Sequence, residues 1–484
     1  MIRAFSAFLA LRYLRSRWIN VLGTLGIAVA VWALIVVIAV FSGFIGEIRG
    51  SIRNATPDLL CTGLAPGASF APIDAVLRAE QDVVATAPRL RHHAMYFPHG
   101  RGQRMQATRA LATNPLAFDA VELVGIDPAA ERSVTDLTHW LERAAGAAPE
   151  AAPDATREAG VTDLQRPFDV PREIEEQHAL RSGASLGPNR LLAASPGILV
   201  SRRRMTTSWL ERGQQLDVVT GRFERAEFGT QLLRVRRGFA VSGAYDTGHR
   251  ILDETTAFVG IDELRDVLGF CVDDPFATAP QDVVSDVAIR VRDGADLAAV
   301  ALRLEAALRR TADQAMAGAR VLTWEEQNRV YLGAVGQERA MMKLVLFAVM
   351  LVAASLVYGT QHMTVMQKIK DIGILSSMGA SPRGVQQVFL LAGLVVGLLG
   401  CGLGVAGGLL SVHWLNDVND WSRRQLGIEL FPTELYALDR VPYAIEPVWV
   451  AQVAFAALCV AFLAAWFPSR RAARMDPVLA LAYE

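Results

Sequence analysis

Few residues in this chain could perform catalysis. No Gly-x-x-x-x-Gly-Lys-[Ser/Thr] occurs in its 484 residues, so the sequence has no recognised phosphate-binding loop for ATP. His-Glu-x-x-His is also absent, which argues against a zinc protease of that type. His92, His93 and His99 could suggest a metal, but three histidines beside Gly100 in a loop are more often exposed. The sequence therefore predicts a non-catalytic protein with no catalytic residue, no metal site and no cofactor of its own.

Charged side chains that could contact a partner gather in one short stretch, Gln367–Ser381. It lies between two apolar runs, Leu344–Met366 and Val385–Val412, each near or above the ~20 residues that cross a bilayer as a helix. Ser381-Pro382 predicts a helix start, with Ser as N-cap and Pro at the first position. The stretch is thus predicted to be a turn with a short helix at the membrane surface. Its spacing leaves two interpretations open, an ordinary basic loop and a contact surface for a cytoplasmic partner.

The same stretch resembles a loop of the four-span ABC permeases, which include the lipoprotein-releasing (Lol), MacB-type and FtsX-type proteins. Their pattern is close to E-K-x-x-D-I-G-I-L-x-x-x-G-A-S, and Gln367 stands where they usually have an acid. The resemblance implies that this loop docks on an ATPase, and that ATP and Mg²⁺ are bound by that partner. The ATPase-coupling residues it implies are Lys368, Lys370, Asp371, Ile372, Gly373, Ile374, Leu375, Gly379, Ala380 and Ser381.

Composition predicts an integral membrane protein with a large soluble part. The chain is 52% hydrophobic and 20% charged, with a mean hydropathy of +0.27. The net charge of −1 gives no indication of nucleic-acid binding. Cys401 and Cys459 lie in apolar runs and are interpreted as packing residues. Cys61 and Cys271 would share one soluble domain, where a disulfide and two free thiols both remain possible.

The predicted fold class is four transmembrane α-helices with a large α+β extracytoplasmic domain between the first and second spans. The first 20 residues carry four arginines and no acid, which predicts an amphipathic helix in the headgroup region. A signal peptide is the competing interpretation, but the apolar run that follows is long and no small-residue cleavage site ends it. The predicted parts are a cytoplasmic amphipathic helix at 1–20, spans at 21–46, 344–366, 385–412 and 447–467, the α+β domain at 47–338, the coupling loop at 367–384, an outer loop at 415–446 and a tail at 468–484.

The α+β character of the large domain follows from short β-like runs that alternate with helical stretches. Residues 144–188 are rich in Ala, Pro, Glu and Gly and lack periodicity, so they are predicted to be a disordered or loosely attached insertion. The predicted strands are Asp58–Thr62, Gly197–Ser201, Gln215–Thr220, Arg234–Ala244, Thr256–Ile261 and Asp286–Val291, and the predicted helices include Asp262–Leu268 and Asp296–Arg310.

The third span is rich in glycine at a helical spacing. Three Gly-x-x-x-Gly pairs favour close helix packing in lipid, although mere flexibility is the alternative. The glycines are Gly393, Gly397, Gly400, Gly404 and Gly408.

Three further stretches resemble Lol permeases in particular. Leu435–Pro442 resembles their V-Y-Y-I-D-R-L-P, Phe41-Ser42-Gly43-Phe44 resembles M-N-G-F, and Pro468–Glu484 resembles their C-terminal ending. The resemblance implies a subunit that extracts lipoproteins from the outer leaflet of the bacterial inner membrane, with a second permease subunit, an ABC ATPase, a lipoprotein substrate and a periplasmic carrier as partners. It also implies an apolar substrate cradle, formed by Val40, Phe41 and Phe44 on the first span and Met341, Leu344 and Phe347 on the second.

Lys and Arg bias predicts the orientation. The N-terminus, the Gln367–Arg383 loop and the tail are basic and the Leu415–Glu446 loop is acidic, so both termini are predicted to be cytoplasmic. The spans contain no Asp or Glu, which argues against a proton-relay carrier. Two alternatives stay open: a MacB-like efflux or mechanotransmission permease, and an FtsX-like scaffold that regulates a cell-wall hydrolase.

Overall fold

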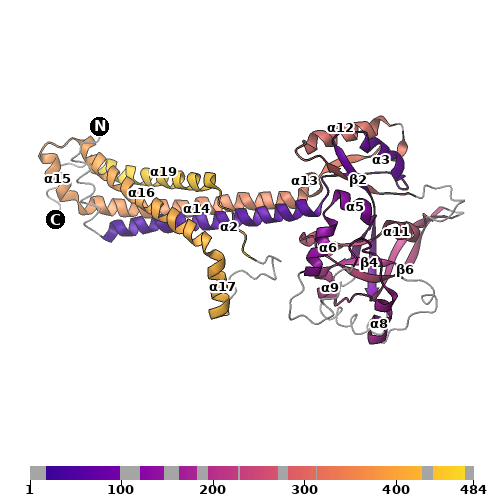
Figure 1. The fold of residues 1–484 in the computed structure, drawn as a ribbon. Helices are drawn as coiled ribbons and strands as arrows, with labels where there is room; N and C mark the ends of the chain where they lie inside the picture. The colour runs from indigo at the N-terminus through magenta and orange to yellow at the C-terminus, as the bar shows by residue number, and fades with distance from the viewer. Residues whose placement is uncertain are drawn as a thin grey trace. The chain divides into compact units, whose positions relative to one another are not determined.

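The computed structural model describes residues 18–98, 120–146, 163–182, 195–226, 229–270, 282–311, 313–427 and 440–474. These residues form two compact units (Figure 1). One unit comprises Met1–Ile48 with Tyr331–Glu484, and the other is Arg49–Val330. The predicted N-terminal amphipathic helix, most of the C-terminal tail and Leu435–Asp439 lie outside the described residues.

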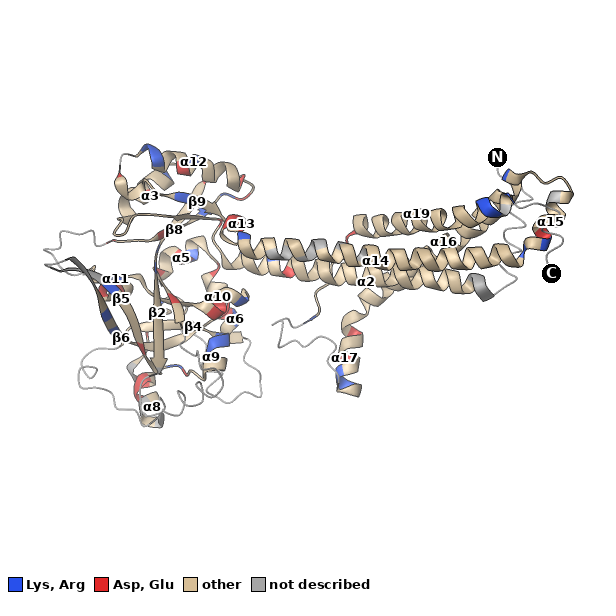
Figure 2. Cartoon of the chain, turned by 180° about the vertical axis from the view of Figure 1, so that it is seen from behind, with Lys and Arg blue, Asp and Glu red and all other residues tan. Residues whose placement is uncertain are grey.

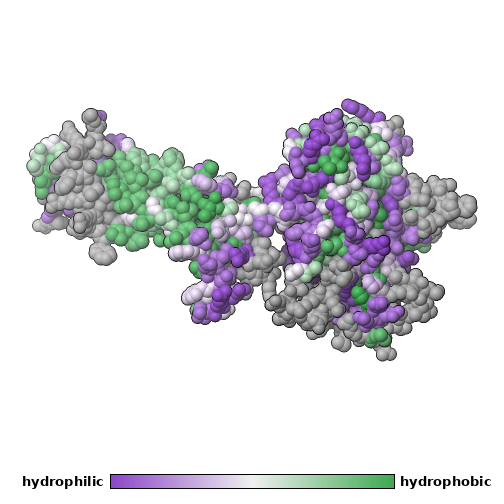
Figure 3. Space-filling view, viewed as in Figure 1, coloured by the Kyte–Doolittle hydropathy of each residue, from purple (hydrophilic) through white to green (hydrophobic). Residues whose placement is uncertain are grey.

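The first unit contains four helices that are long and apolar enough to cross a membrane. These helices are α2 (Trp18–Ala55), α14 (Arg329–Gln367), α16 (Pro382–His413) and α19 (Pro447–Ala473). Each of the four predicted spans lies within one of them. Figure 2 shows few charged residues along the spans. Figure 3 shows a hydrophobic surface over the same helices, which is what lipid contact requires.

Small and β-branched residues fill the interior of this unit. Ile27, Val31 and Ile35 of α2 pack with Val396 of α16 and with residues of α14 and α19. The α19 residues in this cluster include Ala457, Ala461 and Ala464. Alanine brings helix axes close together, and in lipid such close packing replaces the hydrophobic effect as the source of helix association.

The second unit is built on a nine-stranded mixed sheet with the order β3-β7-β4-β6-β5-β2-β8-β1-β9. β3 also pairs with β2, so six of the strands close into a ring and β8, β1 and β9 extend from it. The β3–β7 and β4–β6 pairs are parallel and the others are antiparallel. The strands are β1 Leu59–Thr62, β2 Val83–Pro98, β3 Ala120–Ile126, β4 Gly197–Ser201, β5 Gln215–Ala226, β6 Gly229–Tyr245, β7 Thr256–Gly260, β8 Asp286–Val291 and β9 Arg320–Thr323.

Helices cover the faces of this sheet and share its core. In α12, the Asp296 carboxylate caps the backbone N–H groups of Ala298 and Ala299, and Leu304 and Leu308 are buried. The helices are α3 Phe70–Arg78, α5 Pro128–Val134, α6 Leu137–Gly146, α8 Arg172–Ser182, α9 Arg202–Ser208, α10 Arg250–Thr255, α11 Ile261–Leu268, α12 Leu297–Arg310 and α13 Trp324–Gln327. Each of the six predicted strands overlaps an observed strand, and the helices predicted at 262–268 and 296–310 are confirmed as α11 and α12.

Part of the predicted disordered insertion is ordered, which corrects that interpretation for residues 163–182. Phe168 packs against the aromatic cluster of Trp140, Tyr245 and Phe258, and Val170 is buried. The close approach of the Phe168 carbonyl leaves no room for a side chain at residue 197, which is glycine. The polar, proline-rich composition therefore gave no indication that Phe168 and Val170 pack into the core, or that the helix α8 forms. Residues 144–146 belong to α6 (Leu137–Gly146), and the remaining parts of the insertion, 147–162 and 183–188, lie outside the described residues.

The end of α2 is fastened to the sheet by a small charged cluster around Trp324. The guanidinium carbons of Arg49 and Arg53 lie 5.6 and 5.8 Å from the centre of the Trp324 ring. Arg53 also pairs with the buried Asp58, whose other oxygen accepts the backbone N–H of Val291 at 2.8 Å. The arrangement connects the C-terminal turns of α2 to both edges of the sheet extension.

Candidate functional site

The predicted coupling stretch forms a short helix, α15 (Ile369–Ser377), between α14 and α16. Lys368 precedes it and donates a hydrogen bond from Nζ to Asp371 Oδ2 at 2.8 Å. Ser381 begins α16, because its hydroxyl accepts the N–H of Gly384 at 3.2 Å and Pro382 follows at the first helical position. These local bonds fix both ends of the turn.

α15 has one face turned to the spans and one turned outward. Ile372 is buried against Val365 of α14 and against Val385 and Phe389 of α16. On the outer face, Ile374 is 49% exposed and Met378, just after the helix, is 80% exposed. Because residues four apart lie one above the other on a helix, exposed Lys370 completes this outer row. Two exposed apolar side chains beside a cation form a surface that fits a protein partner.

Gly379 permits the sharp exit from α15. Its φ is +90°, a left-handed conformation that residues with a side chain rarely adopt. The N–H of Ala380 donates to the Leu375 carbonyl at 3.0 Å, which closes the helix end. No side-chain clash excludes a larger residue at this position, so the backbone conformation alone selects glycine.

The ten predicted coupling residues differ in how deeply they are buried. Ile372 and Gly373 are buried; Lys368, Asp371, Leu375 and Ala380 are half-buried; Lys370, Ile374, Gly379 and Ser381 are exposed. Met378 is a residue that the motif comparison missed. Its position four residues after Ile374 was the available signal, because that spacing places both side chains on one face.

The five glycines of α16 lie against two different helices. A Cβ atom at Gly393 or Gly397 would lie 2.4 or 2.9 Å from the Cβ of Ala465 or Ala461 on α19. The other three of these glycines, in the second half of α16, lie against α2 instead. There, a Cβ at Gly400, Gly404 or Gly408 would lie 2.8, 2.7 or 2.9 Å from the Cβ of Ile27, Val31 or Ile35. One glycine row thus allows α16 to pack closely against both neighbours.

Two stretches that resemble Lol permeases meet in the fold. A Cβ at Gly43, in the Phe41–Phe44 stretch, would lie 2.3 Å from the Tyr443 Cα atom, which follows Leu435–Pro442. The N–H of Ala444 donates to the Ala39 carbonyl of α2 at 2.9 Å. Glycine at residue 43 is therefore required by backbone contact between segments 400 residues apart in sequence.

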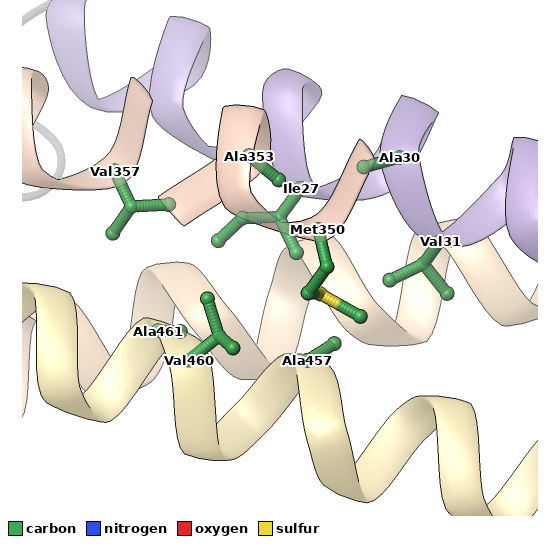
Figure 4. A pocket seen from close by; sticks show the side chains of 9 residues that line it. All are labelled: Ile27, Ala30, Val31, Met350, Ala353, Val357, Ala457, Val460 and Ala461. Atoms are coloured by element: carbon green, nitrogen blue, oxygen red, sulfur yellow. The ribbon is translucent and has the colours of Figure 1, made fainter. Parts of the chain in front are cut away.

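The six predicted cradle residues occupy α2 and α14. Val40, Phe41 and Phe44 are half-buried on α2, whereas Met341, Leu344 and Phe347 are exposed on α14. The structure also has a small apolar pocket further along these two helices and α19 (Figure 4). Its lining residues are Ile27, Ala30, Val31, Met350, Ala353, Val357, Ala457, Val460 and Ala461. None of the six predicted residues lines it.

Of the histidines that could suggest a metal, His92 and His93 lie in the strand β2 and not in a loop, and His93 is exposed. A ring nitrogen of His92 lies 2.9 Å from the Gly221 carbonyl oxygen, and His99 lies outside the described residues. Among the described residues, no group of three His, Cys, Asp or Glu side chains could hold a metal. Cys61 is a buried free thiol whose pKa is raised to about 12 by burial, and Cys271 lies outside the described residues.

One short stretch matches a serine nucleophile pattern, in a chain for which the sequence predicts no catalytic residue. Residues 183–187 read Gly-Ala-Ser-Leu-Gly, which fits Gly-x-Ser-x-Gly. In hydrolases that turn joins a strand to a helix, whereas here the stretch follows the helix α8 and lies outside the described residues.

Comparison with known proteins extends the resemblance along the chain. Residues 343–477 match the family described as FtsX-like permease C-terminal. The chain is 26% identical to the lipoprotein-releasing system transmembrane protein LolC of Neisseria meningitidis serogroup B, over 99% of each chain. It is 24% identical to LolC of Xylella fastidiosa over 100% of each chain. Identity to the macrolide export ATP-binding/permease protein MacB of Wolinella succinogenes is 36%, over 25% of this chain and 16% of that protein.

These matches confirm the resemblance first found in short motifs. The similarity to transmembrane proteins of lipoprotein-releasing systems covers the whole chain, including the α+β unit. The similarity to MacB and to the FtsX-like family is confined to shorter segments. Together with the four apolar helices, these matches support an integral membrane protein that is similar to FtsX-like permeases over residues 343–477.

Proposed function

We propose that this protein, which resembles lipoprotein-releasing permeases along its whole length, is the permease subunit of an ABC transporter. The transporter extracts lipoproteins from the outer leaflet of the bacterial inner membrane. The observation that carries the proposal is the similarity to LolC over 99–100% of both chains. The similarity to a macrolide exporter covers a quarter of this chain, so it supports a shared permease part and not an efflux function.

The partner ATPase binds ATP and Mg²⁺ and docks on α15. Supporting this assignment, α15 packs Ile372 into the spans and leaves Lys370, Ile374 and Met378 facing outward. The helix is joined to a span at each end, so a displacement of α15 moves α14 and α16 together. A second permease subunit, the same chain or an unlike one, completes the transporter.

Basic residues support the orientation. Both termini and α15 lie in the cytoplasm, since Lys and Arg are enriched at these segments, and the α+β unit lies outside the cytoplasmic membrane. The α+β unit then faces the compartment from which a periplasmic carrier would collect the released lipoprotein.

Lipoprotein extraction is work against the hydrophobic effect. Each acyl CH₂ withdrawn from the bilayer costs roughly 0.8 kcal/mol, so a multi-acylated substrate requires both an energy source and a protein surface that covers the chains. The exposed apolar residues Met341, Leu344 and Phe347 of α14, with Val40, Phe41 and Phe44 of α2, are the proposed surface.

The proposal is tested by ATP-dependent release. The chain is purified with its bound ATPase and second permease subunit, reconstituted in vesicles that hold a tri-acylated protein, and supplied with ATP. We expect the lipidated protein to move into a soluble carrier fraction, and the same protein without its acyl chains to be ignored. Vesicles with a hydrolysis-deficient ATPase serve as the control. ATP hydrolysis by the intact complex without any transfer of lipidated protein would exclude the proposed function.

A further inference from the structure

The loop after the third span contains an unexpected helix, α17 (Leu415–Leu426). The sequence predicted a polar return to the fourth span here. Trp414 ends α16 and begins α17, and Gly427, with φ +65°, ends the helix. Asn416 holds the helix to the chain before α19: its Oδ1 accepts the Val441 N–H at 2.9 Å, and its Nδ2 donates to the Val441 carbonyl at 3.3 Å. α17 is therefore fixed in place beside the spans.

The burial pattern of α17 is inverted relative to a helix on a water-soluble domain. Asn419 and Ser422 are 9% and 4% exposed. In contrast, Trp414, Val418 and Trp421 are 51%, 49% and 59% exposed. Their i, i+4, i+7 spacing makes them one stripe along the helix. Among the described residues, polar side chains of α17 are buried and the large apolar ones are exposed, so the stripe is an apolar surface available to lipid or to another molecule.

The placement of α17 indicates what covers it. In Figures 1 and 2, α17 runs across the direction of the four spans, not along it. It leaves α16 near the place where the hydrophobic surface of the spans ends in Figure 3. The exposed Leu403 and Leu410 of α16 continue the lipid-facing surface of that span up to Trp414. A helix that leaves a span where its apolar surface ends, and runs across it, has the geometry of an interfacial helix.

We propose that α17 is an interfacial helix that rests in the membrane surface through Trp414, Val418 and Trp421. Tryptophan favours the headgroup region because its ring is apolar and its indole N–H remains hydrated. The charged residues Asp417, Asp420, Arg423 and Arg424 occupy the remaining side. They are two acids and two bases, so the helix has no net charge and binds neutral lipid as well as anionic lipid.

A fluorescent amino acid encoded at Val418 tests the contact in the full chain. The protein is reconstituted in phosphatidylcholine vesicles with or without brominated acyl chains, and the matched control carries the label at exposed Arg423. We expect brominated lipid to quench the label at 418 several-fold more strongly than the label at 423, and aqueous iodide to do the opposite. The difference is expected to persist when salt is raised, because the helix is neutral.

Two results would overturn the proposal. Equal quenching by iodide at both positions would place the stripe in water. Protection of the label at 418 from lipid and iodide together would show that a protein, such as the second permease subunit, covers it. A parallel pair with the label at Trp421 and Arg423 gives an independent measurement if the variant at 418 does not assemble.

Discussion

Gly404 shows how strongly a single hydrogen side chain determines the packing of the spans. A Cβ there would lie 2.7 Å from both the Ala28 carbonyl oxygen and the Val31 Cβ. Gly402, two residues earlier in the same helix, has no atom within 4 Å of its Cβ position. The two glycines therefore share a sequence context and differ in whether another helix lies against them.

Replacing Gly404 by leucine is expected to lower the stability of the full chain by about 1–3 kcal/mol, the usual cost of overpacking. Gly402→Leu is the matched control, since both changes remove the same helix-disfavouring glycine. The thermal midpoint and membrane yield in detergent measure the difference. If the two leucine variants are equally stable, the close contact between α16 and α2 is wrong.

Asp253 gives a pH dependence that can be assigned to one carboxyl group. Burial raises its pKa to about 6. The carboxylate also accepts a hydrogen bond of 2.7 Å from the Thr247 hydroxyl, which favours the charged form and opposes this rise. The folded state thus binds this proton more tightly than the unfolded state does. The associated stability is fully present below the unfolded pKa of 3.8 and is lost as the pH rises to about 6.

The Asp253→Asn variant should lack this dependence, because its side chain is neutral at every pH. Relative to wild type, it should gain roughly 2.5 kcal/mol of stability between pH 4 and pH 7, because one pKa unit corresponds to about 1.4 kcal/mol and the unfolded carboxyl group is already partly ionised at pH 4. Thermal midpoints of both proteins across that range measure the gain, and other titrating groups cancel in the comparison. Parallel curves for the two proteins would show that Asp253 ionises normally.

At the scale of elements, α15 joins a buried anchor to an exposed contact row. Ile374→Asp should disrupt a protein interface without opening the core, because Ile374 is half-exposed while Ile372 holds the helix to the spans. We expect most of the ATPase to be lost from the purified complex, with the thermal midpoint of the chain unchanged. Leu302→Asp, at an exposed leucine of α12 in the α+β unit, is the charge-matched control. ATPase retention equal to that of Leu302→Asp would show that α15 is only a turn.

Elements with a single strong signal were predictable from sequence, and elements defined by tertiary contacts were not. The four spans are long apolar runs, and α11 and α12 follow acidic or capped starts. β2 was missed because Pro88 and two histidines interrupt its pattern, although three different strands pair with it. Sequence spacing places Met378 on one face with Ile374, and Trp414, Val418 and Trp421 on one face of α17, but it does not say whether that face is covered. The exposure of both sets became visible only in the structure.

At the scale of the whole molecule, the order of the segments along the chain determines which of them lie on the same side of the membrane. The α+β unit is inserted between the first and second spans, and α15 lies between the second and third. Two segments separated by one span must lie on opposite sides of the membrane. The basic residues near both termini and α15 predict, by the positive-inside rule, that these segments are cytoplasmic.

Cysteine labelling with a membrane-impermeant maleimide tests this orientation in whole cells whose outer membrane has been made permeable. Ala306 on α12 and Ser377 on α15 are exposed, so each can be changed to cysteine with little cost to packing. The background should be Cys271→Ser, since Cys61 and Cys401 are buried and Cys459 lies in a span. Labelling at Ala306→Cys and protection at Ser377→Cys until the cells are lysed are expected. The reverse pattern would place the α+β unit in the cytoplasm, where it could not meet a lipoprotein in the outer leaflet, and would remove α15 from any cytoplasmic ATPase.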